Sequence, residues 1–176
     1  ALWPLQTMPF FVDQDGRALG DSTAISHYLD RAYPAPAAPR LWPSEGDDAA
    51  LVFKVAALVD GALNNAVDYG TRLYPLRSHD AWGAVSGEAL RRAQAALDAL
   101  AAEVPSLGRT TVARSGWSAA DMWLFAAIEW FESLPERAPT FAFAAQIMTL
   151  GLKLPEGLSR WADAHRELPD VKALSV

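Results

Sequence analysis

The sequence predicts an α+β protein that is predominantly helical, and three observations predict this class. Within residues 9–33, short apolar runs first alternate with turn residues, and a helical pattern follows them. A proline-dense stretch, PAPAAPRLWP, follows at residues 34–43 and is expected to be stiff and extended. Beyond it, apolar residues recur at helical spacing. We therefore expect a short α/β segment at 1–33, a linker at 34–43 and an all-helical region at 44–176.

The first segment is expected to open with a hairpin. Pro9 should start a strand over residues 9–12, because proline cannot donate a ladder hydrogen bond. Residues 13–16 (DQDG) have turn chemistry, with a glycine that tolerates positive φ. Residues 17–19 return as a short strand, which Gly20 breaks.

A helix follows the hairpin and begins at two polar residues. Asp21 or Ser22 should cap it, because both side chains can accept hydrogen bonds from the free amides of the first turn. Its apolar face comprises Ala24, Ile25, Tyr28 and Leu29. Such a helix start attracts anions, since its free N–H groups and its dipole both point outward. The alternative is an ordinary helix cap that binds no ligand.

Three main helices are expected in the helical region. The first begins near Leu51, is capped by Asp47 or Asp48 and ends at Pro75. The second has its apolar positions over residues 90–104 and stops at the next proline.

The third main helix runs from Ser118 to about residue 133 and is apolar nearly all round, which predicts a central, buried position. Pro135 and Pro139 are expected to break it. A connecting loop precedes it at 105–117. Shorter helices are expected over 141–150 and 156–167, with a last turn at 169–174.

Ser118 and Asp121 form a capping-box pattern, with Asp in place of the usual Glu or Gln. The Ser118 hydroxyl can accept from the Asp121 N–H, and the Asp121 carboxylate can reach back to the Ser118 N–H. Trp117 and Met122 occupy the flanking staple positions. We expect a structural role for this box.

Composition excludes several functions. The net charge of −6 gives no footprint for nucleic acid, and zero cysteines exclude disulfides, thiolate metal sites and a cysteine nucleophile within this chain. His27, His79 and His165 are widely spaced, so no metal site is expected and packing or surface roles are favoured. The longest apolar run, 122–131, is interrupted by a glutamate, and the start ALWPLQ is no convincing signal peptide. A cytoplasmic protein without a membrane partner is the default expectation.

These motifs resemble the glutathione S-transferase family, in its bacterial type. Pro9 and the Asp21–Ser22 pair match the cis-proline and the acidic–Ser pair of its thioredoxin-like domain, and residues 22–25 look like its Ser-x-Ala-Ile signature. The Ser118 box and the tail also resemble the family's C-terminal helical domain. The resemblance implies that 1–33 is the second half of the glutathione-binding domain and that 44–176 is the substrate domain. The first half-domain, with the thiol-activating residue, would lie upstream, so the catalytic residue is unknown.

The resemblance also implies site residues. Met8 would pair its main chain with the cysteinyl part of glutathione, next to a cis Met8–Pro9 bond, although an edge-strand Pro9 in trans is the alternative. Asp21 would bind the α-amino group of the γ-glutamyl moiety, and Ser22 would hold its carboxylate. Tyr69, Arg72 and Trp123 are candidates for a substrate cleft, although most aromatic residues are more simply core.

The expected function is transfer of the glutathione thiolate to an unidentified small hydrophobic electrophile. The alternative is a non-catalytic binding or assembly protein of the same fold. A homodimer is implied by the family, and it is also favoured because the first long helix has apolar residues beyond one stripe, namely Val52, Phe53, Val59 and Leu63. The alternative is a monomer in which Val52 and Phe53 cover the linker.

Overall fold

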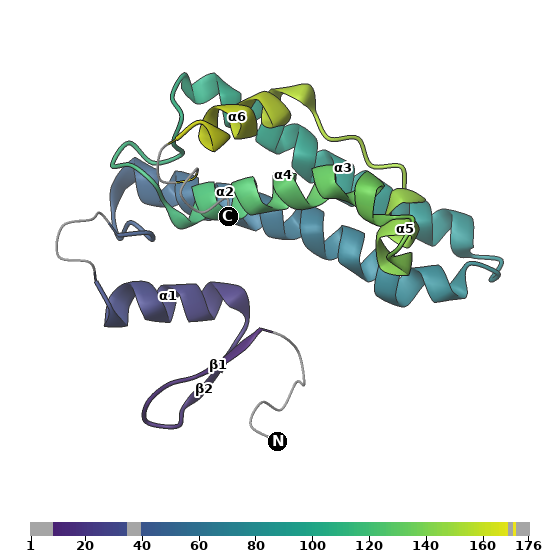
Figure 1. Ribbon diagram of the computed structural model, residues 1–176, viewed down its shortest axis with the longest axis horizontal. Coiled ribbons are helices and arrows are strands. Elements are labelled where there is room, and N and C mark those ends of the chain that lie inside the picture. The colour runs from purple at the N-terminus through teal and green to yellow at the C-terminus, as the bar shows by residue number, and fades with distance from the viewer. Residues whose placement is uncertain (1–8, 35–39, 169–170, 172–176) are drawn as a thin grey trace.

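The computed structural model describes residues 9–34, 40–168 and 171 of the 176-residue chain. A two-stranded hairpin and the helix α1 (Ser22–Ala32) lie on one side of a larger helical region, as Figure 1 shows. The helical region contains α2 (Gly46–Asp68), α3 (Trp82–Glu103) and α4 (Ala119–Arg137), followed by the shorter α5 (Ala142–Met148) and α6 (Glu156–Arg166). The expected class, a small sheet with a predominantly helical remainder, is confirmed.

The hairpin joins β1 (Phe10–Val12) to β2 (Ala18–Gly20) in an antiparallel pair, in which Phe11 faces Leu19. Gly20 is the last residue of β2 and pairs with Phe10, so the expectation that it breaks the strand is wrong. The Asp13 carboxylate closes the turn by accepting the backbone N–H groups of Asp15 at 2.9 Å and Arg17 at 2.8 Å.

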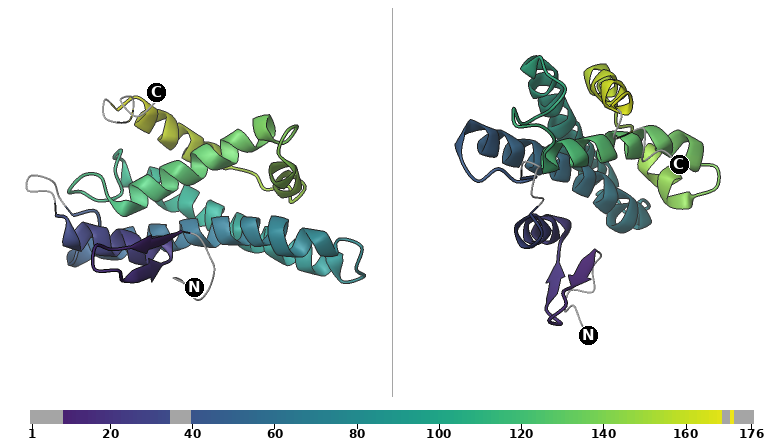
Figure 2. Two further views of the ribbon diagram at one scale, coloured as in Figure 1. Left: turned by 60° about the horizontal axis from the view of Figure 1, so that its bottom comes forward. Right: turned by 60° about the vertical axis from the view of Figure 1, so that its left-hand side comes forward.

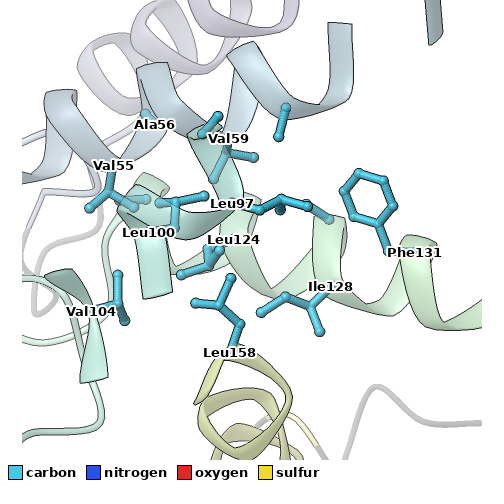
Figure 3. Packing of buried hydrophobic residues seen from close by; sticks show 14 of the residues in the cluster. Val55, Ala56, Val59, Leu97, Leu100, Val104, Leu124, Ile128, Phe131 and Leu158 are labelled. Carbon is cyan, nitrogen blue, oxygen red and sulfur yellow. The ribbon is translucent and has the colours of Figure 1, made fainter. Parts of the chain in front are cut away.

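The core lies where α2, α3 and α4 cross, and α6 covers it from one side (Figures 2 and 3). The core includes one almost completely buried leucine from each of α3, α4 and α6, namely Leu100, Leu124 and Leu158. The Arg166 guanidinium ties α6 to α4, because its Nε donates to Glu129 at 2.7 Å and it also pairs with Glu132. The expectation that the third main helix is central is therefore confirmed.

The first long helix begins earlier than expected. α2 starts at Gly46 after Glu45, whose side chain makes no capping bond, so the expected cap at Asp47 or Asp48 is wrong. Asp48 instead accepts the backbone N–H of Arg114 at 2.9 Å, which fastens the loop before α4 to α2. At its other end α2 stops at Asp68, earlier than expected, and the chain continues as the π-helical turn η1 (Tyr69–Leu73) and the 3-10 turn η2 (Tyr74–Leu76). Pro75 lies within η2, and the helical run ends one residue after it.

Two further helix boundaries differ from the sequence expectation. α3 begins at Trp82 rather than near residue 90, because the Trp82 ring packs 5.4 Å from the Tyr69 ring and draws this glycine-containing stretch onto α2. Pro135 does not break α4, which continues to Arg137. A proline this close to a helix end removes only its own backbone hydrogen bond, and the bond from Ala138 N to Leu134 O at 2.9 Å, after the proline, is present.

By length and composition alone, the segment 48–76 could cross a membrane. A third of its apolar window (33%) is buried inside the protein. Its face of Val55, Val59, Ala62 and Ala66 forms part of the core against α3 and α4. A helix at the centre of a helical layer needs the same apolar composition, so this finding is weak evidence for a membrane.

Candidate functional site

The N-terminus of α1 has an unusual backbone. Asp21 is the N-cap residue, with φ 76° and ψ 130°, and no other non-glycine residue in the described part of the chain has a positive φ. Its Oδ1 accepts the backbone N–H groups of Thr23 at 2.7 Å and Ala24 at 3.3 Å. Such a conformation costs of order 1–3 kcal/mol, and it is concentrated at binding and active sites.

Ser22 is the first residue of α1 and, like Asp21, is exposed to solvent. The sequence left open whether Asp21 or Ser22 caps this helix. In the structure the capping side chain is that of Asp21. Ser22 therefore presents its hydroxyl at the positive end of α1 without being needed to close the first turn.

A second carboxylate lies near this helix start. Asp60, on α2, is half-buried, and burial together with the negative charge of Asp21 raises its pKa. Two neighbouring carboxylates favour a cation between them, whereas the α1 N-terminus favours an anion. Asp60 was not predicted from the sequence, although it stands out there as a lone acid within the apolar run AALVDGAL.

Aromatic rings fix α1 against the helical region. Trp42 is buried and stacks on His27 of α1 with ring centroids 4.0 Å apart, and Trp123 of α4 meets it edge-on at 5.5 Å. The Trp42 indole N–H donates to Ser26 at 3.1 Å. Burial, and secondarily the charge of Arg31, lowers the pKa of His27, which fits the expected packing role of this histidine.

Comparisons with known proteins agree with this geometry. The sequence model described as "Glutathione S-transferase, N-terminal domain" matches residues 1–37. A glutathione transferase family member from Pseudomonas fluorescens Pf-5, solved with bound glutathione, is 21% identical, with a TM-score of 0.67 over 97% of this chain and 74% of that chain. The chain has the glutathione transferase fold. The sequence resemblance to that family is thereby confirmed.

Two further structures extend the likeness. A glutathione S-transferase from Methylobacillus flagellatus KT with glutathione bound is 22% identical, with a TM-score of 0.65 over 97% of this chain and 76% of that chain. One from Methylobacterium radiotolerans JCM 2831, in complex with glutathione sulfonate, is 18% identical, with a TM-score of 0.66 over 97% and 72%. A search of curated proteins gave no match.

Within this glutathione transferase fold, the expectation for Met8 cannot be compared with the structure. Met8 lies outside the described residues, and the expected cis bond to Pro9 therefore does too. Pro9 itself is described and exposed, directly before β1. Its assigned role stays a prediction.

The three cleft candidates are not brought together. Tyr69 is buried, and its hydroxyl lies 2.7 Å from that of Thr149, while Arg72 is exposed and pairs with Asp68 at 3.4 Å. Trp123 packs at the opposite end of α2, beside Trp42. The Trp42 ring packs against Phe53 of α2, and Phe53 precedes Tyr69 by sixteen residues, which corresponds to roughly 24 Å at a helical rise of 1.5 Å per residue. The described residues therefore form no single cleft from this set.

The Ser118–Asp121 capping box is present at the start of α4. Asp121 Oδ2 accepts the Ser118 backbone N–H at 2.9 Å and its hydroxyl at 2.6 Å, and Oδ1 accepts the Val112 N–H at 2.7 Å. Burial raises the pKa of Asp121, while the hydrogen bonds from Ser118 and Val112 oppose that shift. Both residues of the box are fully buried, so these contacts stabilise the start of α4 and the loop before it.

Proposed function

We propose that this protein binds glutathione at the N-terminus of α1 and transfers its thiolate to a small hydrophobic electrophile. The observation that supports this most directly is the strained, solvent-exposed Asp21 next to Ser22, in a segment that matches the glutathione S-transferase N-terminal domain. The solved relatives with bound glutathione have the same fold and support the same ligand.

The proposed contacts follow from charge. The γ-glutamyl α-carboxylate binds at the hydroxyl and backbone N–H of Ser22, at the start of α1, where the helix dipole favours an anion. The α-amino group binds beside the Asp21 carboxylate, and the nearby Asp60 adds to the negative potential for this cation. Met8 supplies main-chain bonds to the cysteinyl part. No described residue is assigned the thiol-activating role, which needs a donor or a positive charge that lowers the thiol pKa.

The protein is further proposed to act as a cytoplasmic homodimer without a metal cofactor. Within the described residues, no group of three or more His, Asp and Glu side chains could hold a metal ion. Phe53, at the start of α2, remains 46% exposed and is a candidate contact for a second subunit.

Calorimetry on the full-length protein tests the ligand. Asp21→Asn keeps an oxygen that can cap α1 but loses the charge, so it should leave the melting temperature within a degree or two. We expect it to weaken glutathione binding tenfold or more, as should Ser22→Ala, because a charge-assisted bond contributes about 1.5–3 kcal/mol.

The matched control is Asp80→Asn, which removes the charge of an exposed aspartate outside the site and should leave glutathione affinity unchanged. Unchanged affinity in both Asp21→Asn and Ser22→Ala, with the fold intact, would refute the assignment. Binding without turnover of any electrophile would instead favour the non-catalytic alternative.

A further inference from the structure

A small apolar cavity of about 130 Å³ lies inside the helical region, away from α1. Its lining side chains are all hydrophobic and come from α3, α4, α5 and the segment after α5, with some polar backbone atoms exposed between them. The lining residues are Leu97, Phe131, Leu134, Pro135, Ile147, Met148, Leu152 and Leu154. Leu97 and Phe131 belong to the core, at the side of it that Figure 3 shows nearest the end of α4.

One wall of the cavity is held in place by a side-chain clamp. The Gln94 amide on α3 donates to the Lys153 carbonyl at 2.9 Å, and its oxygen accepts the Lys153 N–H at 3.0 Å. This pair fixes the backbone between Leu152 and Leu154, and both leucines lie against the core. Because Gln94 bonds both the backbone N–H and the carbonyl of Lys153, this backbone segment is held at the edge of the cavity and does not fill it.

The opposite side of the cavity gives access to solvent. Met148 is 45% exposed at the end of α5 and also lines the cavity. Methionine is unbranched and flexible, so its side chain can move aside for an entering molecule.

We propose that this cavity is a second ligand site, which takes a compact, uncharged apolar molecule about the size of a benzene ring or a short branched alkyl group. A cavity of about 150 Å³ lined by Leu, Ile and Phe in another protein binds benzene, and the volume and the lining side chains here are comparable. None of its lining side chains is charged or can donate a hydrogen bond, which excludes ionised ligands on grounds of desolvation.

The site is separate from the proposed glutathione site. α5 packs on Gly70, just beyond the end of α2, whereas Asp60 lies ten residues earlier, roughly 15 Å along the helix axis. The proposal therefore does not depend on glutathione binding, and a molecule bound here would not be the electrophile that reacts at α1.

The test is titration of the full-length protein with benzene, observed through the methyl resonances of Ile147 and Met148. We expect saturable shifts with a dissociation constant on the order of 1 mM, and a melting temperature about 3–5 °C higher at tenfold that concentration. Naphthalene, which is too large, and benzoate, which is charged, should give neither effect.

Two variants locate the binding. Leu152→Phe fills the cavity, and Met148→Trp blocks its mouth from an exposed position that tolerates change; each should abolish the benzene shifts. Leu63→Phe is the control, because this leucine is partly buried outside the cavity. Benzene binding that survives in Met148→Trp or Leu152→Phe, equal binding of benzoate, or no saturable shift in the unmodified protein would overturn the proposal.

Discussion

Asp121 shows how a single buried carboxylate can organise two segments of chain. It accepts three hydrogen bonds, two from Ser118 and one from Val112, and is fully buried. It therefore holds the loop before α4 against the first turn of that helix. Asp21 performs a similar cap on α1, but at an exposed position with a strained backbone. The buried cap stabilises the fold, whereas the exposed one lies where glutathione is proposed to bind.

Replacing Asp121 should be costly. Asp121→Ala leaves three donors without their acceptor inside the core. Each buried donor without an acceptor lowers the stability of the fold by about 1–3 kcal/mol. Burial raises the pKa of Asp121, so the variant also removes some desolvation cost. We expect a net loss of about 3 kcal/mol in the free energy of unfolding, measured by urea titration. Asp48→Ala, which loses one bond from Arg114, should cost less than about 1 kcal/mol. Equal losses in both variants would contradict this account.

Asp13 should make the hairpin sensitive to acid. The backbone hydrogen bond from Arg17, together with the weaker effect of the one from Asp15, outweighs the opposing effect of burial and lowers the pKa of Asp13 below its usual 3.8. A carboxyl with a lowered pKa stabilises the folded hairpin above about pH 4, and this contribution is lost as pH falls through the folded pKa. Amide exchange of Arg17, corrected for its intrinsic pH dependence, should therefore become faster between pH 5 and 2. In Asp13→Asn the protection should no longer change with pH; an unchanged pH dependence would count against this role.

At the scale of elements, helix contacts decide where helices begin, bend and end. α2 passes into the π-helical turn η1 at the place where α5 packs against it. Gly70 makes this approach possible, because a Cβ at this position would lie 2.7 Å from Ile147 Cδ1 and 2.8 Å from Phe143 Cε2. Real Cβ atoms essentially never come this close to a neighbour, so any side chain here would force the Ile147 and Phe143 side chains to shift.

Gly70→Ala should therefore displace α5. We expect a loss of about 1–3 kcal/mol in the free energy of unfolding, as for other overpacked cores, with faster amide exchange in α5. Gly87→Ala on α3 is the matched control, since nothing lies within 4 Å of a Cβ there. It should stabilise the protein by about 0.5–1 kcal/mol, because alanine is the better helix former. A neutral Gly70→Ala would show that α5 can move away without cost.

At the scale of the whole molecule, the structure revises the argument for a second apolar face. Val52 and Val59 are buried in the core, so the expectation that they form a surplus face is wrong. Leu63 is only partly buried, and Phe53 stays 46% exposed while its ring packs 5.1 Å from that of Trp42. The dimer therefore stays a prediction that rests on Phe53 and on the family resemblance.

Light scattering of the full-length protein at micromolar concentration tests this dimer. We expect twice the subunit mass, and a shift toward one subunit mass in Phe53→Ser, because a polar side chain would be buried at the interface. Phe141→Ser, at an equally exposed phenylalanine beside α5, should stay dimeric. A single-subunit mass for the unmodified protein would exclude the dimer.

Features that depend on neighbours along the chain were predictable from the sequence alone. The hairpin turn, the Asp21 and Ser118 caps and the stop at Pro105 are set by hydrogen bonds or ring constraints within a few residues, and all were predictable. The glutathione transferase resemblance likewise rests on such local motifs.

Features that depend on distant segments became apparent only in the folded protein. The proximity of Asp60 to Asp21, the stacking of Trp42 on His27 and the apolar cavity each require elements far apart in sequence to meet. The early start of α3 has the same origin, because packing of Trp82 outweighs a weak local helix propensity. Local hydrogen bonds are encoded within a few residues, whereas packing depends on which faces finally touch.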